Sequence, residues 1–226
     1  TLSGALKRMT ATELAVPTAS AAMEQAGVSP DDIDHVIYGN VLQTANDAIY
    51  LARHVGLRAE IPQQVPALTL NRLCGSGFQA IISGAEQILT GQANAVLVGG
   101  SESMSQAPHV THGLRDPQRF GKSPKMVDLL WECLTDTYTG APMAMTAEKL
   151  GDTYNLTRDD VDEYAATSQA RWQNANEQGF FNDEIVPLTL KSRKGEVIFN
   201  TDEHPRPSTK EQLGKLGPVF KKDGLV

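Results

Sequence analysis

The stretch that decides the fold is residues 66–100, which read PALTLNRLCGSGFQAIISGAEQILTGQANAVLVGG. Residues 66–71 form an apolar, strand-like run, and residues 95–98 form a second run whose lack of alternation suits a strand covered on both faces. Between them, apolar side chains recur at helical spacing on one face, which we expect to be buried, namely Phe78, Ile81, Ile82, Ala85, Ile88 and Leu89. Strand, helix and strand within about 30 residues predict a βαβ unit with parallel strands and a right-handed crossover.

The residues before this unit continue the alternation of helix and strand. Thr10 and Glu13 are spaced as a capping box for a helix that ends at Gly27, and Pro17 inside it predicts a kink or a later start. Residues 35–41 read as a strand. Residues 48–55 read as a short helix closed by Gly56. This part of the chain is therefore predicted to be an α/β domain.

The pattern changes after residue 100. Residues 101–125 show little periodicity, which marks a boundary or a long loop. Thr157 and Asp160 then predict the start of a helix that runs to Gly179. Residues 185–191 and 196–199 read as a β-hairpin with its turn at 192–195, and the tail is irregular apart from a helical turn or two around residues 211–216.

Composition narrows the class of function. The chain has 226 residues, 40% of them hydrophobic and 21% charged, which supplies enough apolar material for a sizeable core. Its formal net charge is -7, whereas nucleic-acid binding requires clustered positive charge, so no nucleic-acid partner is expected. Because there is no run of about 18 apolar residues and no signal-peptide pattern at residues 1–10, we expect neither a membrane span nor secretion.

The two cysteines, Cys74 and Cys133, are too few for a disulfide framework or a zinc cage, and each is therefore judged as a thiol. Cys74 stands where a strand turns into a helix, and there the unpaired N–H groups and the helix dipole favour thiolate. Gly75 and Gly77 leave room for a thioester to approach, and the free N–H groups could bind an oxyanion. The alternative is a buried packing cysteine, which is also the role we expect for Cys133.

The segment NRLCGSGFQ at residues 71–79 resembles the nucleophile segment of thiolases, most nearly the degradative 3-ketoacyl-CoA thiolases of mitochondrial and bacterial type. The resemblance covers nearly the whole chain. It includes, in the order found in that family, GNVLQ at 39–43, YLARHVGL at 50–57, GGSESMS at 99–105, PMAMTAE at 142–148 and PVF at 218–220.

The resemblance implies that Cys74 takes the acyl group from a 3-ketoacyl-CoA and releases acetyl-CoA, after which a second CoA removes the acyl group. The reverse direction is a Claisen condensation. Coenzyme A and acyl-CoA are then substrates, no cofactor is bound permanently, and the setting is fatty acid β-oxidation. Pro142 stands where short-chain biosynthetic thiolases have a histidine, which favours the degradative branch.

The resemblance also implies a layered α/β/α half with an inserted α+β loop domain. Residues 1–104 would form the N-terminal core without its first strand, and residues 105–226 the loop domain that covers CoA. Leu134 and Met143 match positions that line the pantetheine and acyl tunnel, although a methionine there could equally be core. Arg206 matches an arginine packed against adenine, and its alternative is an exposed ion-pairing residue.

The family's second half carries a histidine that activates the nucleophile, a second cysteine and an asparagine-containing oxyanion site. None of these motifs occurs in these 226 residues. We therefore expect that this chain alone does not turn over, although the parent protein does. No metal is expected, since His109 and His112 lack a suitably spaced acidic or thiol partner.

The family further implies a homodimer, often paired into a homotetramer, whose strands near Asn71 meet across the interface. The expected location is the cytoplasm for a bacterial protein and the mitochondrial matrix for a eukaryotic one. Two other readings stay open: a non-catalytic CoA-binding or dimerisation fragment, and a short-chain acetoacetyl-CoA thiolase. A cysteine hydrolase is a distant third, because no histidine or Asn/Asp context supports one.

Overall fold

The computed structural model describes every residue except 116, 118–119 and 193–194. The chain divides into two compact units, Thr1–Leu130 and Trp131–Val226, each of which is described by itself. The boundary predicted from the sequence, between residues 104 and 105, falls inside the first unit and stays a prediction.

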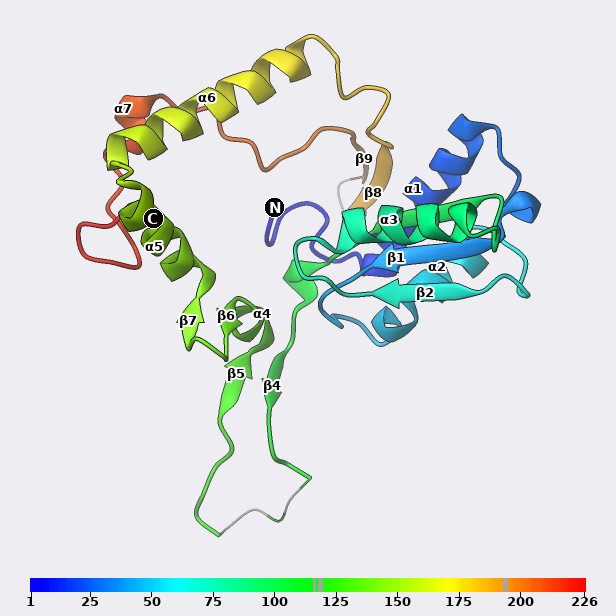
Figure 1. Ribbon diagram of the computed structural model, residues 1–226, viewed down its shortest axis with the longest axis horizontal. Helices are drawn as coiled ribbons and strands as arrows, with labels where there is room; N and C mark the ends of the chain where they lie inside the picture. Colours follow the sequence, from blue (N-terminus) through cyan, green and yellow to red (C-terminus); the bar gives the residue numbers. More distant parts are fainter. Residues whose placement is uncertain (116, 118–119, 193–194) are drawn as a thin grey trace. The chain divides into compact units, whose positions relative to one another are not determined.

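The centre of the first unit is a parallel sheet of three strands among the described residues, in the order β2-β1-β3 (Figure 1). These strands are β1 (His35–Gly39), β2 (Ala67–Leu70) and β3 (Val96–Gly100). β1 pairs in parallel with both neighbours, so β2 and β3 run in the same direction, as the predicted βαβ unit requires. The two strands of that unit are not adjacent, because β1 lies between them.

One face of the sheet is covered by α1 (Ala11–Ala26) and α2 (Leu51–Arg58). The predicted capping box of Thr10 and Glu13 is present, and Gly27 ends α1 in the left-handed region at φ 64°. Side chains from both helices and the sheet form the main core, which includes Ala15, Met23, Val36, Tyr38, Leu51, Val55 and Leu97. Burial raises the pKa of Tyr38 to about 12, so this tyrosine stays neutral within the core.

The opposite face of the sheet is covered by α3 (Ser76–Leu89), which follows β2 through a tight turn (Figure 1). α3 is buried on its small side, through Ser76, Ala80 and Gly84. A Cβ built on Gly84 would lie 2.7 Å from Cγ1 of Val98, and one on Gly39 of β1 would lie 2.7 Å from the backbone carbonyl carbon of Ser76. Small residues therefore let the helix backbone rest directly on β1 and β3.

The apolar face of α3 that the sequence predicts to be buried is exposed instead, so this prediction is wrong. The exposed large side chains of the helix are Phe78, Ile81, Ile82, Ile88 and Leu89. The physical reason is the close approach, because a stripe of isoleucines against the sheet would hold the helix further from β1 and β3 than Gly39 and Gly84 allow.

Two other helix boundaries differ from their predictions. A 3-10 turn, η2 (Ala48–Tyr50), precedes α2, and α2 continues through Gly56 to Arg58. Gly56 does not close the helix; a Cβ there would lie 3.2 Å from Cγ2 of Val36, so the glycine permits α2 to pack closely on β1. α1 begins at Ala11 and runs through Pro17, so the later start does not occur.

The rest of the first unit consists of short elements. They are η1 (Pro30–Asp32), η3 (Met104–Gln106), and the antiparallel pair β4 (His109–Thr111) and β5 (Met126–Asp128). The following helix α4 (Leu129–Cys133) crosses the boundary between the two units.

The second unit contains β6 (Thr135–Asp136), β7 (Ala141–Pro142), α5 (Met143–Tyr154), α6 (Arg158–Glu177), β8 (Leu188–Ser192), β9 (Gly195–Phe199) and α7 (Lys210–Leu213). α6 begins after Thr157 as predicted, with a capping box formed by Thr157 and Asp160, and it ends slightly before Gly179. The predicted hairpin is confirmed as the antiparallel pair β8 and β9, although residues 193–194 of its turn lie outside the described residues.

Charged side chains join α6 to α7, which lie side by side (Figure 1). Arg158 donates to Asp162 at 2.9 Å and to the carbonyl of Leu213 at 2.9 Å. Lys210 of α7 pairs with Asp159 at 2.7 Å and with Glu163 at 3.1 Å. These contacts anchor the segment after residue 206 to α6.

A buried carboxylate anchors residues 224–226. Glu148 of α5 is 1% exposed and accepts hydrogen bonds from the N–H of Leu225 at 2.8 and 2.9 Å and of Val226 at 2.8 Å. A Cβ on Gly224 would collide with this carboxylate, which explains the glycine. The N–H donors of Leu225 and Val226, with a smaller contribution from Lys221, hold the pKa of Glu148 below its ordinary value.

The close packing of α3 on the sheet can be tested with Gly39→Ala. Because the new Cβ would lie 2.7 Å from atoms of Ser76, we expect overpacking to lower the free energy of unfolding by about 1–3 kcal/mol. The matched control is Gly77→Ala, where a Cβ meets nothing within 4 Å. Urea unfolding of this chain measures both, and equal midpoints for the two variants would contradict the proposed close packing.

The carboxylate of Glu148 predicts a pH dependence. Since the folded-state pKa is lowered from 4.5, the stabilising contribution is complete above pH 4.5 and is lost as the pH falls through the folded-state pKa. We expect Glu148→Gln to speed amide exchange in residues 218–226 at pH 7, with the difference from the parent chain shrinking on acidification. Glu184→Gln, at an exposed position, is the control. A pH-independent difference would argue against an ionised carboxylate in this role.

Candidate functional site

Cys74 lies at the carboxyl end of β2, two residues before α3 begins. Its side chain is exposed. The N-cap residue Gly75 provides no side-chain hydrogen bond to the first turn of the helix, whose N–H groups have no acceptor within the helix itself. The N–H groups of Gly75 and Ser76 already donate to the carbonyls of Arg72 and Leu73 at 3.1 and 2.9 Å, so the donors left for a ligand are those of Gly77 and Phe78. Cys74 stands, as predicted, two residues before the positive end of a helix dipole. Within this chain Cys74 is exposed rather than buried among packed side chains, whereas Cys133 is half-buried.

The turn that carries Cys74 has an unusual backbone. Leu73 adopts a positive φ of 50°, a region that a leucine rarely occupies. Hydrogen bonds hold the turn from within: the Oγ of Ser76 donates to the carbonyl of Leu73 at 2.7 Å and accepts from the N–H of Arg72 at 2.9 Å. Ser76 is itself buried against Gly39, so the turn is tied to the strand beneath it.

Leu134 and Met143, the predicted tunnel residues, lie together in the second unit. The N–H of Met143 donates to the carbonyl of Leu134 at 2.9 Å, next to the β6 and β7 pair. Leu134 is 44% exposed and Met143 is 54% exposed. The structure brings these two residues side by side with apolar surface available to a ligand, which fits the predicted role without testing it.

Arg206 lies in the irregular segment between β9 and α7, and its side chain is exposed. Its N–H donates to Oε1 of Gln169 on α6 at 2.9 Å. The residues that follow Arg206 in the chain help to line a cavity of about 490 Å³. It is lined by Ala166, Thr167, Ala170 and Gln173 of α6 and by Pro207, Ser208, Thr209 and Gln212.

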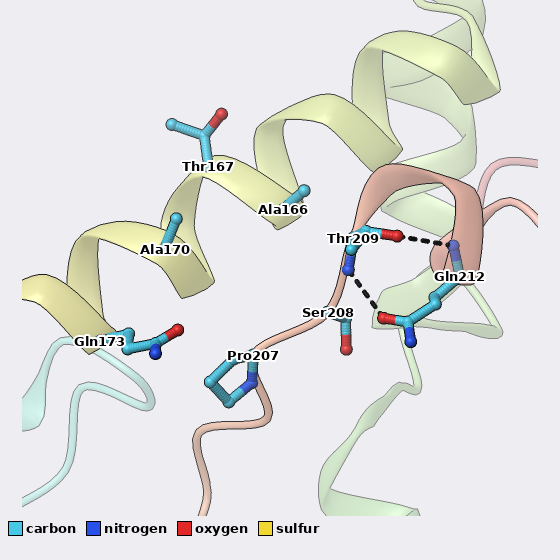
Figure 2. Close-up of a pocket in the computed structure, with 8 residues that line it drawn as sticks. All are labelled: Ala166, Thr167, Ala170, Gln173, Pro207, Ser208, Thr209 and Gln212. Carbon is cyan, nitrogen blue, oxygen red and sulfur yellow. Dashed lines mark hydrogen bonds between the residues drawn. The ribbon is translucent and has the colours of Figure 1, made fainter.

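Figure 2 shows how this cavity is built. The α6 residues form one wall and the segment of Pro207 and Ser208 the other, while Thr209 and Gln212 close a reciprocal capping box at the start of α7. Arg206 was predicted from the family resemblance, whereas these neighbours were not. Alternate polar and small residues on α6 were the available signal.

Two residues that the sequence marked only as members of family motifs, Glu102 and Asn71, hold loops at the carboxyl edge of the sheet. Glu102, directly after β3, accepts hydrogen bonds from the loop that follows β1, and Asn71 accepts one from Leu73. An acidic residue immediately after a buried strand was the available signal for Glu102.

Among the described residues, no group of three or more His, Cys, Asp or Glu side chains is arranged to hold a metal ion. Within the same residues, no helix is long and apolar enough to span a membrane.

The fold and the site define a class: an α/β protein whose parallel strands carry an exposed thiol at their carboxyl end, the edge where ligands bind in open sheets of this kind. The family model described as "Thiolase, N-terminal domain" matches residues 1–226. The chain therefore belongs to the thiolase family and corresponds to its N-terminal domain.

Particular relatives agree with this assignment. The chain is 53% identical over 224 residues to human mitochondrial 3-ketoacyl-CoA thiolase, covering 99% of this chain and 56% of that protein. The crystal structure of the human enzyme matches with a TM-score of 0.97 at 52% identity, covering 100% of this chain and 57% of that one. Its structure in complex with CoA matches with a TM-score of 0.94 at 51% identity, covering 100% and 56%.

An acetyl-CoA acetyltransferase from Syntrophomonas wolfei is 40% identical over 228 residues, covering 100% of this chain and 57% of that protein. The chain thus spans a little over half the length of the relatives it matches. The layered α/β fold expected from the resemblance is confirmed.

Proposed function

We propose that this chain provides the nucleophile of a 3-ketoacyl-CoA thiolase. The observation that carries the proposal is the exposed Cys74 thiol ahead of α3, in a chain that is 53% identical to the human mitochondrial enzyme. In the first step, the sulfur of Cys74 attacks the keto carbonyl of the substrate, and the bond between the second and third carbons breaks. The electron pair of that bond leaves with acetyl-CoA, which takes up a proton, and the shortened acyl group stays on Cys74 as a thioester.

In the second step, the thiol of a free CoA attacks the acyl thioester. Its proton returns to the sulfur of Cys74, and the shortened acyl-CoA leaves. Both steps pass through a tetrahedral oxyanion, which the N–H groups of Gly77 and Phe78 in the first turn of α3 are suited to stabilise. This chain's own part is to hold the sulfur and to offer these donors. The histidine, second cysteine and asparagine expected from the family resemblance do not occur in matching motifs within these 226 residues.

The second unit would bind CoA. Leu134 and Met143 would contact the pantetheine and acyl group, and Arg206 would pack against adenine while its charge faces phosphate. A relative with a TM-score of 0.94 has been solved with CoA, which supports CoA as the ligand. On this proposal residues 105–226 form the domain that covers CoA, CoA enters and leaves as a substrate, and the protein works as a homodimer or homotetramer.

A short-chain acetoacetyl-CoA thiolase is the second candidate, favoured by the 40% identity to an acetyl-CoA acetyltransferase. Against it stands Pro142, which occupies a position where the short-chain enzymes resembled by this chain have a histidine, and which here precedes α5 as its N-cap. The comparisons include mitochondrial enzymes and bacterial ones, so a mitochondrial matrix or a bacterial cytoplasmic location is proposed according to source.

The proposal is tested by mass spectrometry of the chain after exposure to acetyl-CoA. We expect a mass increase of one acetyl group located on Cys74, absent in Cys74→Ser and retained in Cys133→Ser. In parallel, CoA-dependent cleavage of acetoacetyl-CoA by the 226-residue chain should be far below that of an intact thiolase. An adduct on Cys133 alone, or none at all together with no CoA binding, would favour a non-catalytic fragment.

The role of Arg206 is tested by CoA binding to the same chain. We expect Arg206→Ala to raise the Kd for CoA about two- to thirtyfold, because a guanidinium against an aromatic ring contributes about 0.5–2 kcal/mol. Arg206→Lys should recover only part of this loss, since lysine keeps the charge but not the planar group. Arg171→Ala, at an exposed position of α6, is the control. Unchanged calorimetric affinity in Arg206→Ala would remove the arginine from the binding site.

A further inference from the structure

Three loops meet at the carboxyl edge of the sheet, and one of them carries the thiol of Cys74. Residues 40–42 follow β1, residues 71–75 follow β2 and carry Cys74, and residues 101–103 follow β3. Because the three strands are parallel, residues far apart in the sequence are neighbours at this edge. Hydrogen bonds join these loops in one connected series.

The series begins at Glu102, whose side chain is half-buried. Its Oε2 accepts from the N–H of Val41 at 2.8 Å, and its Oε1 accepts from the N–H of Leu42 at 3.2 Å. Oε1 also accepts from Nδ2 of Asn40 at 2.9 Å. One carboxylate therefore fixes three consecutive residues of the loop after β1, and with them the direction of the carbonyl of Val41.

Asn71 connects this loop to the turn of Cys74. Its Nδ2 donates to the carbonyl of Val41 at 3.4 Å, and its Oδ1 accepts from the N–H of Leu73 at 2.8 Å. Leu73 is the residue held at a positive φ, and its side chain is 60% exposed, so packing does not explain its conformation. The hydrogen bonds from Asn71 on one side and Ser76 on the other account for it.

We propose that Glu102 and Asn71 are positioning residues for Cys74. Neither is required to touch a substrate. Glu102 orients the carbonyl of Val41, and that carbonyl orients the side-chain amide of Asn71. The amide in turn fixes the backbone of Leu73, so that the sulfur of the next residue stays beside the first turn of α3. This inference rests on the proposed function, in which the sulfur of Cys74 is the attacking atom.

The readout is the alkylation rate of Cys74 by iodoacetamide in the 226-residue chain, measured by mass spectrometry against Cys133 in the same molecule. Alkylation needs no CoA, so it reports on the placement of the sulfur even if the acyl-transfer proposal fails. Failure of the acyl-transfer proposal would appear separately, as the absence of an acetyl adduct on the chain without substitutions after exposure to acetyl-CoA. Cys133, in the other unit, corrects each measurement for differences in reagent and in folding.

The two substitutions with the clearest geometry are Glu102→Gln and Asn71→Asp. The first replaces one acceptor oxygen with an NH₂ group that would face backbone donors. The second keeps the oxygen that accepts from the N–H of Leu73 but puts a carboxylate oxygen against the carbonyl of Val41. It therefore removes only the hydrogen bond between residue 71 and Val41. Each should lower the Cys74 rate about two- to fivefold, the range expected when negative charge on sulfur loses a helix dipole. Asn46→Asp and Glu86→Gln, both at exposed positions, should leave the ratio unchanged.

The double variant decides between a connected series and two separate structural roles. If Glu102 acts through Asn71, the combined variant should be no slower than the slower single variant, whereas independent effects would multiply. Amide exchange of residues 41–42 should become faster in Glu102→Gln, which weakens the hydrogen bonds to these N–H groups. It should stay unchanged in Asn71→Asp, where Glu102 still accepts from both. Multiplying effects, unchanged ratios, or equal slowing of Cys74 and Cys133 would each overturn the proposal.

Discussion

The close contact of α3 with the backbones of β1 and β3 is the constraint on which the first unit depends. Gly39 lies under Ser76, and Gly84 lies against Val98, at distances where an ordinary side chain would displace the helix. The first turn of α3 is therefore fixed with respect to the sheet, and its N–H groups are fixed with it. Because only Gly75 separates Cys74 from that turn, the position of its sulfur depends on how the helix packs against the strands.

Local signals in the sequence were sufficient for much of this arrangement. The capping boxes at Thr10 and Thr157 and the apolar run before Gly99 depend on neighbouring residues, so they could be predicted. Cys74 was also accessible to prediction, because a cysteine between a strand and a helix with glycines on its far side is a local pattern. The family resemblance added Leu134, Met143 and Arg206, which local chemistry alone would not have separated from ordinary surface and core residues.

What could not be predicted depends on contacts between distant residues. The helical pattern of α3 contains an apolar stripe and a stripe of small residues, and only the glycines of the facing strands decide which of them is buried. Gly56 was misinterpreted for the same reason, since a glycine that admits a neighbouring strand and one that ends a helix look alike in sequence. The hydrogen bonds of Glu102 join residues about sixty positions apart, and no local spacing reveals such a pair.

Two glutamates serve irregular backbone in the same way. Glu102 accepts from Val41 and Leu42, and Glu148 accepts from Leu225 and Val226, so that each carboxylate binds two consecutive N–H groups outside a helix or strand.

The apolar face of α3 points away from the sheet. Five large hydrocarbon and aromatic groups face the solvent there, with Leu89 85% exposed. An exposed apolar surface of this kind promotes aggregation as the protein concentration rises. The 226-residue chain should therefore be handled dilute and cold, and its exposed apolar surface should be measured first by binding of a hydrophobic dye.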